Sequence, residues 1–275
     1  MIASSSVCQN GRVAPRPRPA YPIASVDRAL RLQILVAQRS RMRLSEASRA
    51  LGVAPSTAHR LFAMLVFHDL VRQEDRYTYV PGPALAAIAR VVVQEADLRE
   101  LARPVVADLA AAADETVHLS VLDGRMVRYL VAAESTRVLR VGSRAGLTVP
   151  AHYTAAGKAL LAALVPNQVE RLLGGVELEA RTDRSVTDIT VLARQLGRAR
   201  RLGYAACQGE SEEGVASIAM PVRDGAGRVR AAINIAAPAV RMDRARQDAM
   251  LNELRNAVTR LEEALRDRAT SAGRE

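Results

Sequence analysis

The sequence predicts an α+β protein with an N-terminal winged helix-turn-helix domain, a linker helix and a larger C-terminal α/β domain of the sandwich type. Three patterns lead to this prediction. Residues 44–70 hold two short helical patterns around Gly52, the segment after Leu70 has the pattern of a hairpin, and antiparallel strands alternate with helices in the C-terminal two-thirds. A length of 275 residues suits two domains, and an apolar content of 49% is sufficient for two cores.

Residues 1–24 are rich in Ser, Pro and Arg, so we expect a disordered N-terminal arm. No apolar run follows its arginines, and the longest apolar run, at residues 85–93, is interrupted by Arg90 and too short to cross a bilayer. Cys8 and Cys207 are the only cysteines and form no CxxC pair, which indicates neither a disulfide framework nor a zinc site. We therefore expect a soluble, cytoplasmic protein without a signal peptide or a membrane partner.

The segment 25–38 (SVDRALRLQILVAQ) predicts a first helix that packs beneath the helix-turn-helix. In the next helical pattern, with Leu44, Ala47 and Leu51 at helical spacing, we expect Ser45 to be the N-cap and Leu44 to pack against the helix from outside. Gly52 can adopt the left-handed conformation that ends a helix, and Pro55 suits the first turn of the following one. These residues predict two helices joined by a sharp turn.

The helix that begins at Pro55 has two different faces. Its apolar side chains recur at helical spacing and predict a buried face: Ala58, Leu61, Phe62 and Leu65. The opposite face begins with residues suited to phosphates and base edges in a DNA major groove: Ser56, Thr57, His59 and Arg60. A DNA-reading helix-turn-helix and an ordinary helical hairpin in a core explain these residues about equally well.

Residues 71–73 and 77–80 predict two strands around a tight turn, which after a recognition helix would be a wing. Arg72 and Arg76 would then flank the DNA backbone; alternatively, both solvate a turn. Residues 1–90 contain 13 arginines and 5 acidic residues, a net charge of +8, whereas the remaining residues have a net charge of only +2. Because a hairpin in a core does not need this asymmetry, the charge distribution favours a polyanion-binding domain.

A helix over residues 83–94 carries an apolar stripe, which suggests contact with a second subunit as well as a linker role: Leu85, Ile88, Ala89 and Val92. A separate helix is expected over 97–113, where Pro104 bends the helix or begins its main body. We place the domain boundaries at 1–24 (arm), 25–82 (winged helix-turn-helix), 83–96 (linker helix) and 97–270 (C-terminal domain).

The C-terminal domain is predicted to contain antiparallel strands and helices in alternation. The strands are expected over residues 116–122, 127–131, 138–141, 205–208, 215–222 and 229–236. The helices are expected over residues 154–164, 167–173, 187–201 and 241–268.

The order of motifs resembles the IclR family of bacterial transcriptional regulators. The resemblance rests on LGVAPSTAHRLFAML and YTYVPGPAL in the N-terminal part, and on TAAGKALLA, RRLGYAACQGESEEGVASIAMPVRD and GRVRAAINIAAPAVR in the C-terminal part. It runs from about Ser25 to Arg268. It implies a winged helix, a linker helix used in dimerisation and a GAF-like α/β ligand-sensing domain.

The family resemblance also implies a function. Members act as homodimers or homotetramers on palindromic operators in double-stranded DNA, where a small organic-acid effector changes DNA binding. We therefore expect a sequence-specific transcriptional regulator, a repressor more readily than an activator.

Carried over residue by residue, the family's effector pocket falls on three places. The first is the helix start at Ala155, Ala156 and Gly157, where free N–H groups attract a carboxylate, although close helix packing explains these small residues equally well. The other two are the segment from Cys207 to Ser217 and the strand with Asn234 and Ala236. Cys207 replaces a frequent acid, Ser217 a frequent Cys, and Asn234 and Ala236 replace hydroxyl residues. The pocket is thus less polar, so we expect a larger or more apolar acid, with aromatic acids as candidates.

Other chemistry leaves no pattern in the sequence. The four histidines lack metal-ligand spacing, and there is no nucleophile elbow, Walker loop or dinucleotide fingerprint. We expect no catalytic residue, metal or cofactor. The alternative hypothesis is an enzyme or small-molecule carrier whose basic N-terminal domain serves only for assembly.

Overall fold

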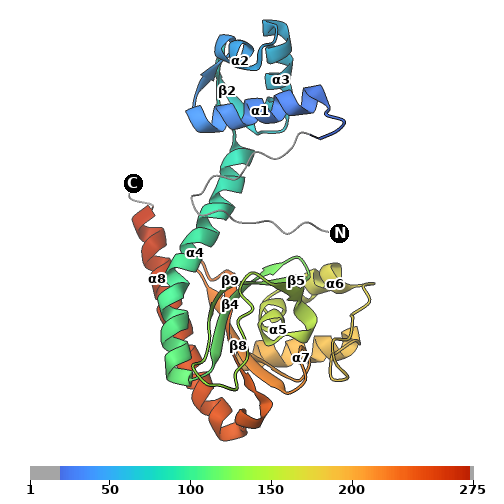
Figure 1. The fold of residues 1–275 in the computed structure, drawn as a ribbon, viewed down its shortest axis with the longest axis vertical. Helices are drawn as coiled ribbons and strands as arrows, with labels where there is room; N and C mark the ends of the chain where they lie inside the picture. The colour runs from blue at the N-terminus through green and yellow to red at the C-terminus, as the bar shows by residue number, and fades with distance from the viewer. Residues whose placement is uncertain (1–18, 273–275) are drawn as a thin grey trace. The chain divides into compact units, whose positions relative to one another are not determined.

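The computed structural model describes residues 19–272, so residues 1–18 of the predicted arm lie outside the described residues. The chain divides into two compact units, and the boundary lies between Gln94 and Glu95 (Figure 1).

The first unit is a winged helix-turn-helix, as the sequence predicts. Its elements in chain order are α1 (Ala24–Arg39), β1 (Met42–Arg43), α2 (Leu44–Leu51), α3 (Pro55–Phe67), β2 (Val71–Asp75), β3 (Thr78–Pro81) and the start of α4 (Pro83–Ala113). The strands form an antiparallel sheet in the order β1-β3-β2.

Local chemistry explains the turn between α2 and α3. Gly52 has a φ of 63° and donates its N–H to the carbonyl oxygen of Arg49, which ends α2. Pro55 opens α3, as expected. The prediction of Ser45 as the N-cap of α2 is wrong, because the helix begins at Leu44. There the Glu46 carboxylate accepts the backbone N–H of Arg43 at 2.8 Å.

One apolar core holds the first unit together. Phe62 of α3 is fully buried and its ring stacks on that of Tyr79 in β3, with centroids 3.7 Å apart. Leu32, Val36 and Ala47 complete the centre of this core from α1 and α2. The core fixes which face of α3 is covered and which is left to solvent.

Helix α4 corrects the prediction of two separate helices. It runs without interruption from Pro83 to Ala113, so the expected break between 94 and 97 does not exist. The residues there (Gln94, Glu95, Ala96, Asp97) include no Gly or Pro, and nothing local ends the helix. Pro104 lies inside α4.

The second unit is a six-stranded antiparallel sheet in the order β6-β5-β4-β9-β8-β7, covered by helices on both faces. Its strands are β4 (Thr116–Asp123), β5 (Met126–Ala133), β6 (Thr148–Pro150), β7 (Ala205–Gln208), β8 (Val215–Arg223) and β9 (Val229–Pro238). Its helices, besides the second part of α4, are α5 (Ala155–Ala162), α6 (Pro166–Leu173), α7 (Ile189–Leu202) and α8 (Arg244–Ala272), with short 3-10 turns η1 (Ala151–Tyr153) and η2 (Ala239–Arg241).

Each face of this sheet has its own core. The second part of α4 lies beside α8 on one face, and α5 and α7 cover the other (Figure 1). The two halves of the sheet are joined by β4 and β9, which pair Thr116 with Ala236 and His118 with Asn234. This register brings side chains of distant segments to one place under the start of α5.

Two predictions about the loop after β5 are corrected. Residues 138–141 are not a strand; Val138 is 99% exposed, and the Val141 carbonyl accepts the hydroxyl of Thr116 at 2.5 Å rather than a strand partner. The sheet instead includes β6, which was not predicted. It pairs Arg128 with Thr148.

No single helix in residues 19–272 is long and apolar enough to cross a membrane. The bent pair α2 and α3 meets the criterion by length and composition only, with an angle of 109° between the two helices.

Thr154 caps α5, and we expect its replacement to destabilise the second unit. Its buried hydroxyl accepts the N–H of Gly157 at 2.9 Å, so Thr154→Val should lower the free energy of unfolding by about 1–2 kcal/mol. Thr154→Ser, which keeps the acceptor, is the matched control. The free energy of unfolding of both variants is measured by denaturant unfolding, followed through the hydrogen exchange of peptides from β4. Equal losses in the two variants would contradict a capping role.

Candidate functional site

The exposed face of α3 carries the residues that the sequence assigned to DNA. Ser56, His59 and Arg60 are exposed and Thr57 is half-buried. The N-cap residue Ala54 has no side-chain oxygen, so no capping side chain occupies the first N–H groups of α3. Pro55 has no N–H, and Thr57 donates its N–H to the carbonyl oxygen of Ala54 at 3.0 Å, so the hydroxyls and the arginine of this face are the groups suited to contact phosphates.

The wing is the hairpin of β2 and β3 in the same unit. It bears the exposed Arg72 and Arg76, and its turn lies at residues 76–77. The Asp75 carboxylate accepts the N–H of Tyr77 at 3.0 Å, which together with Thr78 lowers the pKa of Asp75. The guanidinium of Arg76 lies 5.4 Å from the centre of the Tyr77 ring. Tyr77 was not among the residues predicted for DNA contact, although an exposed tyrosine beside an arginine in a turn was a usable signal.

Five of the seven residues predicted for the effector line one small cavity in the second unit, with a volume of about 10 Å³. They are Ala155, Ala156, Ser217, Asn234 and Ala236. The cavity, here called the inner cavity, is also lined by His118, Tyr129, Thr154, Val215, Arg144 and Ser211. Arg144 lies in a loop that no sequence pattern connects to α5, and Ser211 lies in the predicted segment from Cys207 to Ser217 without having been singled out.

The structure places Gly157 and Cys207 outside the lining of the inner cavity. Gly157 packs against η1: a Cβ atom there would lie 2.1 Å from the carbonyl oxygen of Ala151, which explains why a glycine is required. Cys207 is paired with Ser217 but lies on β7, one strand further from the cavity. Burial raises the pKa of the Cys207 thiol to about 12, so it is protonated at neutral pH.

Two buried polar atoms at the inner cavity have no hydrogen-bond partner among the described residues. They are Nδ1 of His118 and Oδ1 of Asn234, and the two residues are 1% and 5% exposed. Nε2 of His118 accepts the backbone N–H of Arg144 at 3.2 Å, so in the neutral ring the proton is on Nδ1. Burial, assisted by the charge of Arg144, lowers the pKa of His118 to about 4. Unpaired buried polar atoms are costly, which makes them a signal for a ligand.

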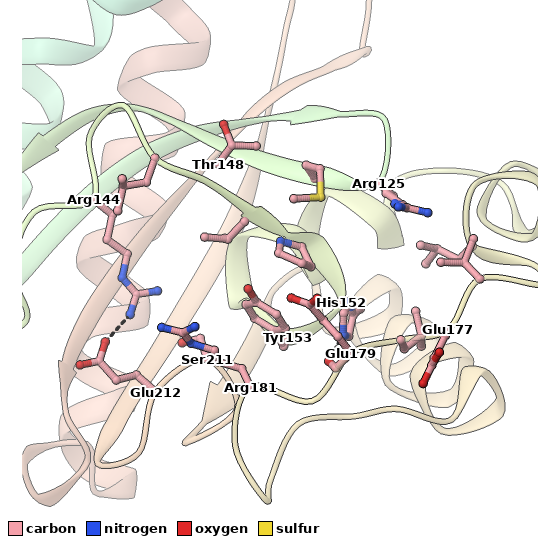
Figure 2. Close-up of a pocket in the computed structure, with 17 residues that line it drawn as sticks. Arg125, Arg144, Thr148, His152, Tyr153, Glu177, Glu179, Arg181, Ser211 and Glu212 are labelled. Carbon is pink, nitrogen blue, oxygen red and sulfur yellow. Dashed lines mark hydrogen bonds and ion pairs between the residues drawn. The ribbon is translucent and has the colours of Figure 1, made fainter. Parts of the chain in front are cut away.

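A larger hollow of about 590 Å³ adjoins the inner cavity, and we call it the outer hollow (Figure 2). Arg144 and Ser211 line both spaces. Arg144 forms an ion pair with Glu212, with Nη2 and Oε2 2.8 Å apart. The far side of the hollow includes Arg125 and His152, whose Nε2 lies 2.9 Å from the carbonyl oxygen of Glu179.

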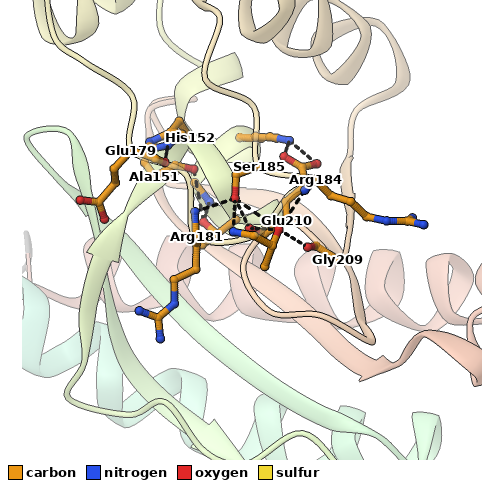
Figure 3. Close-up of polar contacts among 12 residues, drawn as sticks. Ala151, His152, Glu179, Arg181, Arg184, Ser185, Gly209 and Glu210 are labelled. Carbon is orange, nitrogen blue, oxygen red and sulfur yellow. Dashed lines mark hydrogen bonds and ion pairs between the residues drawn. The ribbon is translucent and has the colours of Figure 1, made fainter.

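Behind the inner cavity, a buried ion pair ties α5 to the loop that carries Ser211 and Glu212. Nζ of Lys158 lies 2.6 and 2.5 Å from the two carboxylate oxygens of Glu210, and both side chains are buried. The hydroxyl of Ser185 donates to the carbonyl oxygen of Glu210 at 2.7 Å (Figure 3). Thr182 donates to the carbonyl oxygen of Gly209 at 2.6 Å. These contacts fix the loop that forms one wall of both spaces.

Comparisons with known protein families match both units. Residues 25–75 match the family model described as the IclR helix-turn-helix domain. Residues 90–263 match the model described as the C-terminal part of the bacterial transcriptional regulator IclR.

Individual proteins are similar over most of the chain. The transcriptional regulator BhcR of Paracoccus denitrificans is 32% identical over 240 residues, which cover 87% of this chain and 86% of BhcR. A transcriptional regulator from Rhodococcus sp. RHA1, known from a crystal structure, is 27% identical in sequence and superposes with a TM-score of 0.61. The match covers 89% of this chain and 98% of the Rhodococcus chain. An IclR homologue from Microbacterium hydrocarbonoxydans, solved in complex with 4-hydroxybenzoate, is 26% identical with a TM-score of 0.58, and the match covers 88% and 98% of the two chains.

Proposed function

Since this chain belongs to the IclR family of bacterial transcriptional regulators, we propose that it binds a palindromic operator through α3 and the wing, and that a small organic acid in the second unit changes this binding. The family assignment makes the chain a DNA-binding regulator rather than an enzyme. The observation that carries the DNA contact is the exposed face of α3, with Ser56, His59 and Arg60 beside an uncapped helix start.

We propose a separate function for each predicted domain. Residues 25–82 contact DNA, and residues 97–270 bind the effector. Residues 83–96, within α4, connect the two parts and take part in self-association. Ile88, Val92 and Val93 support the last point, because these apolar side chains are 56%, 65% and 58% exposed in the single chain.

A homodimer or homotetramer would present two copies of α3 to two half-sites, which is why we propose a palindromic operator. We propose repression as the output, because occupancy of an operator is sufficient to block transcription, whereas activation requires a further contact with the polymerase. We place this activity in the cytoplasm, where the DNA is.

The effector is proposed to bind at the inner cavity and the outer hollow. The inner cavity offers neutral donors and acceptors and one guanidinium, which are complementary to an acid. Cys207 and Ala236 stand where many relatives have an acid and a hydroxyl, so we propose a larger or more apolar acid than those of two or three carbons. The 4-hydroxybenzoate bound by the Microbacterium homologue is of this kind.

A gel-shift experiment with the DNA upstream of the protein's own gene tests the operator contact. We expect specific binding whose affinity falls steeply as salt rises, because arginines that neutralise phosphates release counterions. Equally weak binding to every DNA sequence would contradict the proposal. A thermal-shift screen tests the effector, and stabilisation only by two- or three-carbon acids would contradict a larger one.

Arg60→Ala is expected to weaken operator binding by about 1–3 kcal/mol, because a bidentate contact between an arginine and a guanine is worth that much. The measurement is a salt-matched titration of operator and scrambled DNA. Arg103→Ala, which removes an exposed arginine from the second unit, is the control and should leave both affinities unchanged. Unchanged operator affinity in Arg60→Ala would remove Arg60 from the interface.

A further inference from the structure

We propose that Arg144 binds the carboxylate of a hydroxy acid, that Glu212 occupies Arg144 when the acid is absent, and that the inner cavity receives the hydroxyl group of the acid. This assignment rests on the proposed effector function and names the chemical class of the effector. The inner cavity and the outer hollow are then two compartments of one site.

The position of Arg144 supports this role. Arg144 and Ser211 are the two residues that line both compartments, and the Arg144 guanidinium points toward Glu212 (Figure 2). The backbone around Arg144 is fixed: its N–H donates to His118, and Gly146 donates to the carbonyl oxygen of Tyr129 at 2.9 Å. The backbone therefore stays in place while the long side chain can change its partner.

The ion pair with Glu212 is easy to displace. The Glu212 side chain is 63% exposed and that of Arg144 is 17% exposed, so the pair is partly in water and contributes little. A carboxylate that reaches Arg144 from inside the hollow forms two parallel hydrogen bonds to the guanidinium, away from water. Such a carboxylate competes successfully with Glu212.

The polar atoms of the inner cavity identify the second group of the acid. Nδ1 of His118 and Oδ1 of Asn234 are buried there without a hydrogen-bond partner among the described residues. A hydroxyl group satisfies both at once, because it accepts one hydrogen bond and donates another. A volume of about 10 Å³ is sufficient for one oxygen atom with small rearrangement, but not for a carboxylate.

The outer hollow accommodates the apolar part of the acid. Met126, Leu147, Val149, Leu173 and Val176 contribute apolar side chains to a space of about 590 Å³. This volume is within the range of pockets for small organic ligands. The site thus suits an acid with one carboxylate, one hydroxyl and an apolar body.

Isothermal titration of the full-length protein tests the proposal, with 4-hydroxybenzoate and mandelate as probes. Benzoate and phenylacetate lack the hydroxyl, and 4-hydroxybenzamide and mandelamide lack the charge. We expect at least one hydroxy acid to bind at least about tenfold more tightly than its counterpart without the hydroxyl and than its amide.

The variants separate Arg144 and Glu212 from general effects. Arg144→Gln should weaken binding of the hydroxy acid by about tenfold or more, because a charged hydrogen-bonding partner is lost. Glu212→Gln should tighten it by about two- to fivefold, because the competing carboxylate is gone. Arg260→Gln and Asp108→Asn, which change an exposed ion pair that lines neither compartment, are the matched controls and should stay within about twofold of the wild type.

Opposite effects of the two variants cannot arise from a merely structural ion pair, which would make both variants less stable and move affinity in one direction. Weaker or unchanged binding in Glu212→Gln, or unchanged binding in Arg144→Gln, would overturn the assignment while leaving the effector function intact. Absence of binding by every probe to the wild type and to Glu212→Gln would also overturn it. Failure of the gel shift would instead contradict the proposed operator contact.

Discussion

Lys158→Met is expected to destabilise the second unit by about 3–5 kcal/mol, the cost of leaving a buried charge without its partner. Nζ of Lys158 contacts both carboxylate oxygens of Glu210, and the two side chains are only 2% and 9% exposed. Methionine keeps the length and the apolar stem of lysine but removes the charge. The carboxylate of Glu210 then remains buried beside Cys207 without the cation that neutralised it.

The loss is measured by denaturant-dependent hydrogen exchange of β4 peptides in the full-length protein, which reports the opening of the second unit. Arg260→Met is the matched control, because the pair of Arg260 and Asp108 is 54% and 57% exposed and its loss should cost about 0–1 kcal/mol. The double variant Lys158→Met with Glu210→Gln should regain much of the stability, since neither member of this buried pair is then charged. Equal losses for Lys158→Met and Arg260→Met would contradict this account.

The same variant should disturb the effector site at a distance. Glu210 directly precedes Ser211 and Glu212, and its carbonyl accepts a hydrogen bond from Ser185 (Figure 3). Thr182 donates to the same carbonyl at 3.3 Å. If the loop loosens when Lys158 is replaced, the wall shared by the inner cavity and the outer hollow is no longer fixed. The position of Lys158 one turn into α5 thereby links the stability of the second unit to its ligand site.

The N-terminal unit was largely predictable because its signals are local. Gly52 and Pro55 mark the turn, and the spacing of Ala58, Phe62 and Leu65 identifies the buried face of α3 without any knowledge of the rest of the chain. The continuous helix α4 was not predicted. The spacing of apolar residues changes near Ala96 because the helix is largely exposed before this point and has a buried face after it. This change of spacing was interpreted as the end of a helix.

The effector site could be predicted only in part. The family motifs indicated Ala155, Ser217 and Asn234, which line the inner cavity. The sequence held no signal for Arg144, because its loop lies far from the other lining residues in the chain and outside any periodic pattern. Ser211 lies in the segment from Cys207 to Ser217 that the family resemblance indicated, but it was not predicted individually. For Gly157, helix packing and anion binding explained the sequence equally well. The structure favours packing, because the backbone of Ala151 lies too close to Gly157 to leave room for a side chain.

His118 should make the second unit lose stability in acid. Burial and the charge of Arg144 lower the pKa of His118 from its ordinary value of 6.5 to about 4, so the native state holds this ring without a proton where the unfolded state binds one. The unfolded state then binds more protons than the native state between these two values, and stability rises with pH in that window.

The expected consequence is a contribution of about 3 kcal/mol that is present above pH 6.5 and is lost as the pH falls to about 4. Carboxylates of the protein also titrate in this range, so the measurement is a difference. The free energy of opening of β4 is determined by hydrogen exchange at several pH values for the wild type and for His118→Gln, whose side chain does not titrate. The wild type should lose more stability than the variant as the pH is lowered from 7 to 4. Parallel curves would show that the ring of His118 is protonated as easily in the folded protein as in the unfolded chain, and would contradict the effect of burial on its pKa.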